Sequence, residues 1–394
     1  MRIRVLVATL AIALIGTTGC MEEPNPVGVG LLKDDRITVD SSTVVAKGSS
    51  TIRKFPTYRG PTTILLGAES SIQTEAWAWI KFSPLADTLQ DVTLLSASVE
   101  LKGSYAFGNT SSALSFDVHE GLKNWHTDPI IEDDSLSLHA IQAGTYYKSG
   151  VTPSVSTILP NDTAIVSIPL DTALVRQWVN AISDTSKKNF GIVLEPTNNS
   201  LVRGFRSFRD IEPRNSPKLV LIYKRTPTSN PDTVRIDKGT DRFLARVSPT
   251  TRLSDSTTTT IRNGVSYRAV LDFQNVLIPK NYAVHRAMLE VTLEDSTALN
   301  DYTTHTLYAY FMTESGVVEN LLSPSEVGTL NGQKVYRFIV SNFVHFWGRG
   351  MPVRTIAIGG ATEQNTIDVF ALHGPGSSNI ASRPKLIITY TEFR

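Results

Sequence analysis

The residues able to do chemistry are few and scattered along the chain. There are seven histidines and one cysteine, Cys20. No histidines stand at His-x-x-x-His or a similar ligand spacing, and the sequence has no Gly-x-Ser-x-Gly elbow or phosphate-binding loop. We therefore expect no catalytic site, no metal site, no cofactor and no enzymatic activity. A third hypothesis, glycan hydrolysis, would need two carboxylates facing one cleft about 5 to 9.5 Å apart.

One acidic run stands apart from this background. Residues 132–134 read Glu-Asp-Asp, and calcium is bound by several carboxylate and carbonyl oxygens. Such runs are also common in solvated loops. A structural calcium ion and a plain loop are therefore both open for this segment, and we assign it no metal ligand.

Two tryptophans form a candidate binding surface. In a strand, alternate residues face opposite sides, so Trp77, Trp79 and Lys81 share one face and their apolar neighbours the other. The aligned strand of the second half carries Arg268 on this face, which indicates that it points away from the core. Two indole rings rooted about 7 Å apart would suit sugar rings. The alternative is that the N-terminal segment, an insertion near residues 130–160 or the second domain covers them.

Composition limits the class of partner. The chain has 394 residues, with 38 basic and 37 acidic side chains, and this length favours two domains. Nucleic-acid affinity comes mainly from neutralising phosphates, and no basic cluster here is long enough, so we expect no nucleic-acid partner. A single cysteine excludes an intrachain disulfide.

Two similar segments organise the chain around these residues. Residues 217–223 and 384–390 both begin with Pro-Lys, continue as an apolar run and end in tyrosine. Proline fits the first residue of a strand because it cannot donate to a sheet ladder, and the apolar run fits a mostly buried strand. We interpret each as the closing strand of a domain, so that the chain holds two copies of one architecture.

Upstream of each closing strand the same order of elements recurs. Residues 97–102 alternate between apolar and polar, as in a half-buried strand. Asp171 or Thr172 can cap a short helical turn that presents Trp178 on its apolar face, and Trp347 recurs at the matching position of the second copy. Aromatic residues at helical spacing are usually buried, so we place both tryptophans in the core.

The N-terminus has the form of a secretory signal. Residues 1–4 form a basic region with two arginines, residues 5–15 are apolar or small, and residues 16–19 are small. The apolar run is too short to span a hydrocarbon core about 30 Å thick. A segment with repeated proline and glycine follows the cysteine and predicts an extended tether.

Gly19-Cys20 resembles the cleavage box of bacterial lipoproteins, although Thr17 stands where that family usually has leucine. The resemblance implies that Cys20 carries acyl chains such as palmitate, and two or more chains make a durable membrane anchor. Glu22 and Glu23 resemble the surface-export signal of Bacteroidetes lipoproteins. Segments such as 64–67 also resemble a Bacteroidetes lipoprotein family of unknown function, which implies a location but no chemistry.

About 130 residues of the first copy resemble the DNRLRE domains, which are disaggregatase-related carbohydrate-binding modules. The resemblance lies in the order of the strand at 97–101, the helical turn with Trp178, the run Asn-Phe-Gly-Ile-Val-Leu at 189–194, a Phe-x-Ser element and the closing strand at 217–223. It implies jelly-roll β-sandwiches, some of which bind glycans.

Together these features predict an all-β protein with two tandem jelly-roll-like antiparallel β-sandwiches, each with a short helical turn. We expect a signal peptide at 1–19, a lipidated N-terminus and tether at 20–35, a first domain at 36–225, a linker at 226–232 and a second domain at 233–394.

The predicted function is that of a lipid-anchored protein of the outer membrane that faces outward and binds a glycan or extracellular polymer without catalysis. The alternative is a structural or adhesive spacer that docks other envelope proteins.

Overall fold

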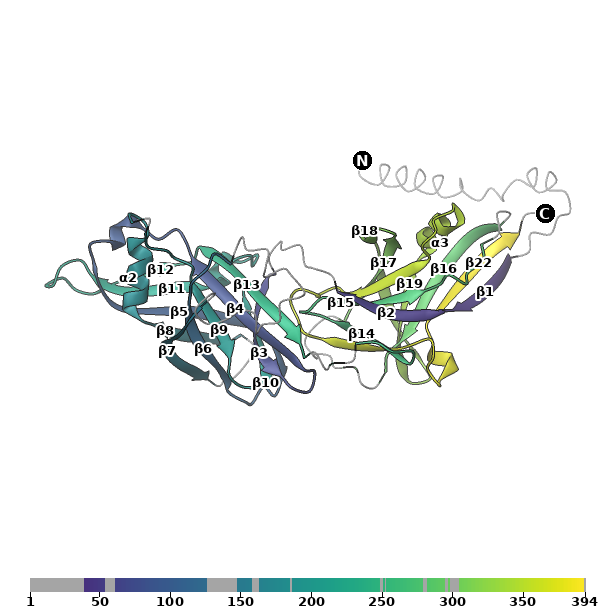
Figure 1. Ribbon diagram of the computed structural model, residues 1–394, viewed down its shortest axis with the longest axis horizontal. Coiled ribbons are helices and arrows are strands. Elements are labelled where there is room, and N and C mark those ends of the chain that lie inside the picture. The colour runs from purple at the N-terminus through teal and green to yellow at the C-terminus, as the bar shows by residue number, and fades with distance from the viewer. Residues whose placement is uncertain are drawn as a thin grey trace, which may run out of the picture.

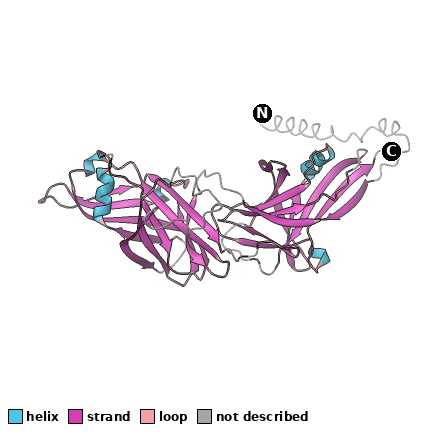
Figure 2. Cartoon of the chain, viewed as in Figure 1, coloured by secondary structure: helices cyan, strands magenta, loops and turns pink. Residues whose placement is uncertain are grey.

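The computed structural model describes residues 39–53, 61–125, 147–157, 163–184, 186–248, 251, 253–278, 282–294, 297 and 305–392. These residues form two antiparallel β-sandwiches, which lie one after the other along the long axis of the molecule (Figure 1). Strands make up most of the regular structure, and each sandwich carries a short α-helix (Figure 2). The predicted all-β fold with two sandwiches is confirmed.

The first sandwich is built around one long strand, β5 (Thr93–Gly108). Its first part pairs with β8 (Ile165–Leu170) and with the closing strand β11 (Lys218–Lys224), and its last residues pair with β10 (Ser200–Arg206). Residues 97–101 alternate as predicted, and their apolar side chains are buried in the core. The other strands of this body are β3 (Thr63–Glu69), β4 (Thr74–Phe82), β6 (Leu114–Gly121), β7 (Tyr147–Thr157) and β9 (Ile192–Pro196).

In the second sandwich the long strand is β18 (Gly316–Leu330), which pairs first with β17 (Leu307–Thr313) and then with β19 (Gln333–Ile339). Its closing strand β22 (Lys385–Glu392) pairs with β16 (Tyr282–Thr292). Both closing strands lie where the sequence predicts them. The remaining strands of this body are β14 (Thr258–Arg262), β15 (Tyr267–Asp272), β20 (Thr355–Gly360) and β21 (Val369–His373).

Short helices close one side of each core. Asp171 caps α2 (Thr172–Asn180), because its carboxylate accepts a hydrogen bond from the backbone N–H of the second helical residue. Trp178 of α2 and Trp347 of α3 (Ser341–Gly348) are both buried, as predicted. The described residues also form short 3₁₀ turns, which are η2 (Asp87–Leu89), η5 (Pro213–Asn215) and η6 (Ile380–Ser382).

The first strands of the chain belong to the second sandwich. β1 (Val39–Val45) pairs with β22, and β2 (Gly48–Arg53) pairs with β15. We call β1 and β2 the leading strand pair. Conversely, β12 (Asp232–Ile236) pairs with β11 and β13 (Gly239–Val247) pairs with β4; these are the central strand pair. Each half of the chain therefore gives two strands to the sandwich of the other half (Figure 1).

The two strand pairs occupy equivalent places. Asp40 lies opposite Tyr390 at the end of β22, and Asp232 lies opposite Tyr223, the matching tyrosine of β11. The same correspondence continues along β2 on β15 and β13 on β4. The chain is therefore a repeat in which the same structural element has been exchanged reciprocally between the two copies.

This exchange corrects the predicted boundaries. The first body spans residues 63–224 and is completed by 232–247, whereas the second spans 258–392 and is completed by 39–53. Residues 226–231 are the turn between β11 and β12 rather than an interdomain linker. The prediction was wrong because the repeat locates the strand pairs along the chain but cannot tell which of two equivalent sheet edges each one joins.

Candidate functional site

Trp77 and Trp79 lie on the face of β4 away from the core, as the alternation predicts. Their rings stack with centroids 6.3 Å apart. The two residues are nevertheless only 5% and 1% exposed. The predicted aromatic platform is therefore wrong, and the half-buried Lys81 beside them lies at the edge of a covered face.

The covering groups come from Trp125, just before the predicted insertion, from Tyr147 within it, and from β13. Tyr147 meets Trp77 edge to face, with ring centroids 5.8 Å apart, and Trp125 joins the same apolar cluster. The indole N–H of Trp125 donates to a backbone carbonyl at 2.8 Å, and Arg242 donates to the Trp125 carbonyl at 3.1 Å. The alternative in which another segment covers the rings is the one observed. The start of β7, at Tyr147, also shows that the insertion holds regular structure.

A buried histidine borders this cluster. His119 is 4% exposed, and its Nε2 lies 2.9 Å from a carboxylate oxygen of Glu195. Tyr147 packs on the imidazole with centroids 4.5 Å apart, and burial together with the Glu195 carboxylate raises the pKa of the tyrosine. Sequence reasoning missed this group because its members lie on three separate strands. The buried imidazole of His119 therefore offers little surface to a substrate.

The equivalent face of the second sandwich carries a buried ion cluster. Arg268, aligned with Trp77, is 1% exposed and donates to Glu363 at 2.8 Å and to Glu319 at 2.9 Å. Its guanidinium lies 4.0 Å from the centre of the Tyr310 ring. Burial disfavours the charge of Arg268, but the two carboxylates outweigh it and raise its pKa above the usual value. Arg268 is therefore buried on its face of β15, as Trp77 is on the equivalent face of β4.

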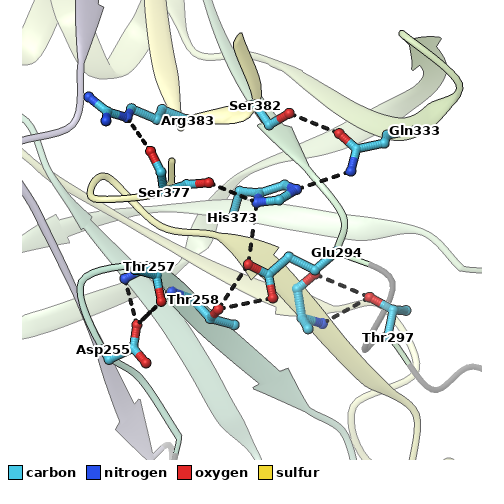
Figure 3. Close-up of polar contacts among 11 residues, drawn as sticks. Asp255, Thr257, Thr258, Glu294, Thr297, Gln333, His373, Ser377, Ser382 and Arg383 are labelled. Carbon is cyan, nitrogen blue, oxygen red and sulfur yellow. Dashed lines mark hydrogen bonds and ion pairs between the residues drawn. The ribbon is translucent and has the colours of Figure 1, made fainter. Parts of the chain in front are cut away.

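A second polar cluster lies at one end of the second sandwich and resembles a serine–histidine–glutamate arrangement (Figure 3). His373 Nδ1 lies 3.1 Å from Ser377 Oγ and 3.3 Å from Glu294 Oε1. The other ring nitrogen, Nε2, lies 3.2 Å from the amide nitrogen of Gln333.

This geometry does not activate Ser377 as a nucleophile. A catalytic triad needs the serine and the carboxylate on opposite ring nitrogens, so that the base can take the serine proton while the acid orients it. Here both groups share Nδ1, and Gln333 occupies Nε2. The cluster instead fixes the loop after β21, since Ser382 donates to Gln333 at 2.8 Å and Arg383 to the Ser377 carbonyl at 2.8 Å.

A polar depression on the first sandwich is open to solvent. A groove of about 350 Å³ lies over β5, β8 and the start of β11 in the first sandwich. Its lining includes three cationic side chains, one carboxylate, one amide and one apolar residue. These are Lys102, Lys218, Arg214, Glu100, Asn215 and Ile165. No sequence motif marks it, because the residues meet only when the strands pair.

Other predicted sites lie outside the described residues. These are the lipidation site Cys20 and the acidic run at 132–134. Within the described ranges, no group of three or more histidine, cysteine, aspartate or glutamate side chains is arranged to hold a metal ion. No helix in those ranges is long and apolar enough to cross a membrane.

Comparison with known proteins adds little. No protein-family model matches the chain, and no curated protein matches it. Among solved structures, the VP2 subviral particle of infectious bursal disease virus is similar at 11% identity and a TM-score of 0.13, over 92% of this chain and 78% of that one. The Gt strain of the same virus gives 12% identity and a TM-score of 0.15, over 92% and 78%. Likeness at this level bears on neither family nor function.

Proposed function

We propose that the protein is a lipid-anchored, outward-facing protein of the outer membrane and acts as a non-catalytic spacer. In this proposal Cys20 carries the acyl anchor, the second sandwich is the base, and the first sandwich is held away from the membrane. The spacer was the alternative in the sequence analysis. It takes precedence because the aromatic platform that favoured sugar binding is covered.

The position of β1 is the observation that carries the proposal. Val39 lies opposite Thr391, so the start of the described chain meets the end of β22. Figure 1 places β1 and β22 at the end of the molecule remote from the first sandwich. A tether that joins the chain at Val39 would therefore reach the second sandwich first.

The junction between the sandwiches supports a stiff spacer. Arg262 of the second sandwich donates to the carbonyl of Ile72 in the first at 2.7 Å, and the backbone N–H of Ile367 donates to the Tyr105 hydroxyl at 3.2 Å. Val265 and Ile367 are buried within the core cluster of the first sandwich. The chain also passes twice between the bodies, after β2 and after β13. Relative motion of the bodies would break apolar packing as well as polar contacts.

Fractionation tests the anchor. Cys20→Ser should move the protein from the membrane fraction to the soluble fraction, because the acyl chains supply the membrane affinity. A mutant protein that still sediments with membranes would rule out the lipoprotein assignment.

Energy transfer tests the orientation. A single fluorophore would be placed by Asp40→Cys in one protein and by Thr228→Cys in another, both exposed positions, with the acylated Cys20 unavailable to the dye. A lipid-borne acceptor should quench the Asp40 site more strongly than the Thr228 site, which lies in the turn between β11 and β12. Equal quenching at the two sites would contradict a spacer standing on its second sandwich.

A further inference from the structure

The open groove of the first sandwich has a closed counterpart in the second. Glu100 of β5 lies opposite Lys218 of β11, and Glu290 of β16 lies opposite Lys385 of β22. In the second sandwich, Lys385 Nζ and Arg337 Nε each lie 2.8 Å from a different oxygen of Glu290. The glutamate and lysine positions are thus repeated, but only the second copy has them locked in an ion cluster.

The difference comes from the third strand. Arg337 lies opposite Glu290 on β19, whereas the residue opposite Glu100 on β8 is the exposed Ser167. A serine cannot reach across the glutamate as an arginine does. In the part of the chain that the structure describes, no ion pair joins Glu100 to Lys218. The first copy therefore keeps a mixed-charge surface where the second copy has a closed one.

Uncharged hydrogen-bond acceptors position the two groove lysines and leave their positive charges in place. Lys102 Nζ donates to the side-chain carbonyl of Asn215 at 2.9 Å, and Lys218 Nζ donates to the backbone carbonyl of Arg214 at 2.8 Å. An ammonium group has three N–H donors, so each lysine keeps others for a ligand. Both partners are uncharged, so the positive charge is not cancelled by them. Hydrogen bonds to two residues of the 3₁₀ turn η5 thus hold both ammonium groups in place.

We propose that this groove binds an acidic polysaccharide, through carboxylate or sulfate groups on its sugars. Lys102 and Lys218 supply charge-assisted hydrogen bonds to the acid groups. Arg214 pairs with Glu212 at 2.9 Å and keeps further N–H donors. Glu100 accepts hydrogen bonds from sugar hydroxyls, and the exposed side chain of Ile165 offers an apolar wall to a ring face. A lipid headgroup fits less well in the proposed orientation, because the groove lies in the sandwich remote from β1 (Figure 1).

Binding is tested in solution with residues 20–394 carrying Cys20→Ser, so the result does not depend on the anchor. The probes are polygalacturonate, dextran sulfate and neutral dextran, with titration calorimetry as the readout. Lys102→Gln/Lys218→Gln should weaken binding of the acidic polymers roughly ten- to hundredfold. Glu100→Gln should strengthen it, because glutamine keeps an oxygen that accepts from sugar hydroxyls while the negative charge beside the acidic polymer is removed. The matched control, Lys187→Gln/Lys188→Gln, removes the same charge from an exposed loop of this sandwich and should leave affinity unchanged.

Three results would overturn the proposal: no binding of either acidic polymer, equal binding of neutral dextran, or equal loss in the control pair. Anionic vesicles that outcompete both polymers would also overturn it in favour of a lipid surface. Circular dichroism checks that each variant is folded. If the double lysine variant does not fold, Glu100→Gln alone decides, because unchanged or weaker affinity contradicts an acidic polymer bound beside Glu100.

Discussion

A cut in the turn between β11 and β12 separates the two halves of the chain and tests the strand exchange directly. We would insert a specific protease site at residues 226–231, where the turn is largely exposed, and cleave the folded protein. Two independent tandem domains would part after this cut. With the exchange, each half still holds two strands of the other's sandwich, so the halves should stay together.

The expected strength follows from what the exchanged strands bury. Val44 and Ile52 of the leading strand pair, and Val234, Ile236 and Phe243 of the central strand pair, pack against the apolar clusters. Full burial of such a side chain contributes about 1.5–3 kcal/mol, and most of these are partly buried, so together they supply roughly 5–10 kcal/mol. A free energy of about 8 kcal/mol corresponds to a Kd near 1 µM. The four strand ladders and the junction between the bodies add to this and offset the translational and rotational freedom that association of the halves costs.

Gel filtration at about 10 µM, an order of magnitude above that estimated Kd, is the assay. Denaturing electrophoresis must show complete cleavage, and the uncut chain is the matched control. The nicked protein should elute at the volume of the uncut chain and separate into halves only when denaturant is added. Elution of two half-size species in plain buffer would refute the exchange, because nothing but the turn would then have held the halves together.

Three further predictions concern stability measured by chemical denaturation. Trp79→Ala should cost about 3–5 kcal/mol, because the indole is 1% exposed, whereas Lys81→Ala should change stability by no more than about 0.5 kcal/mol; the reverse order would contradict the covered face. Glu363→Ala should cost about 3–5 kcal/mol by leaving Arg268 buried with less compensation, whereas Glu319→Ala, at a carboxylate 45% exposed, should cost less than about 1 kcal/mol. Burial raises the pKa of Asp241 on β13 from 3.8 to about 6. The native state then holds its proton where the unfolded state has lost it, so stability falls as pH rises from about 4 to 6, by at most about 3 kcal/mol. The stability of Asp241→Asn relative to the wild type should rise over that window, and a pH-independent difference would contradict the shift.

The sequence was sufficient to predict the elements that depend on local pattern. The Pro-Lys openings located both closing strands, and the Asp171 cap and Trp178 located a helix. The alternation around Trp77 and Trp79 also assigned their face correctly. Each of these rests on a period or a cap that neighbouring residues define, so the chain's own order carries the information.

Pairing between distant strands could not be predicted in this way. Residues 39–53 and 232–247 fit equivalent sheet edges, so pattern alone left their partners undecided. The burial of Trp77 could not be predicted for the same reason, because Trp125 and Tyr147 approach it through tertiary packing. The groove was missed because its lysines and Glu100 are ordinary strand residues until β5, β8 and β11 lie side by side.

Comparison of the two copies suggests one substitution that separates shape from charge in the groove. Ser167 lies opposite Glu100 as Arg337 lies opposite Glu290. Ser167→Arg should therefore rebuild the closed cluster of the second sandwich over the groove of the first. Folding stability should change by no more than about 1 kcal/mol, since an ion pair near the surface contributes little.

The effect of Ser167→Arg on polygalacturonate binding distinguishes two mechanisms. If the groove attracts acidic polymers only by net charge, the added cation should strengthen binding. If the polymer must enter the groove, the introduced side chain should weaken binding even though the protein has become more positive, because it fills the space beside Glu100 and Lys218. We expect weaker binding, measured by the same calorimetry. Stronger binding would show that the surface acts as a diffuse positive patch and that the open pair of the first copy forms no site.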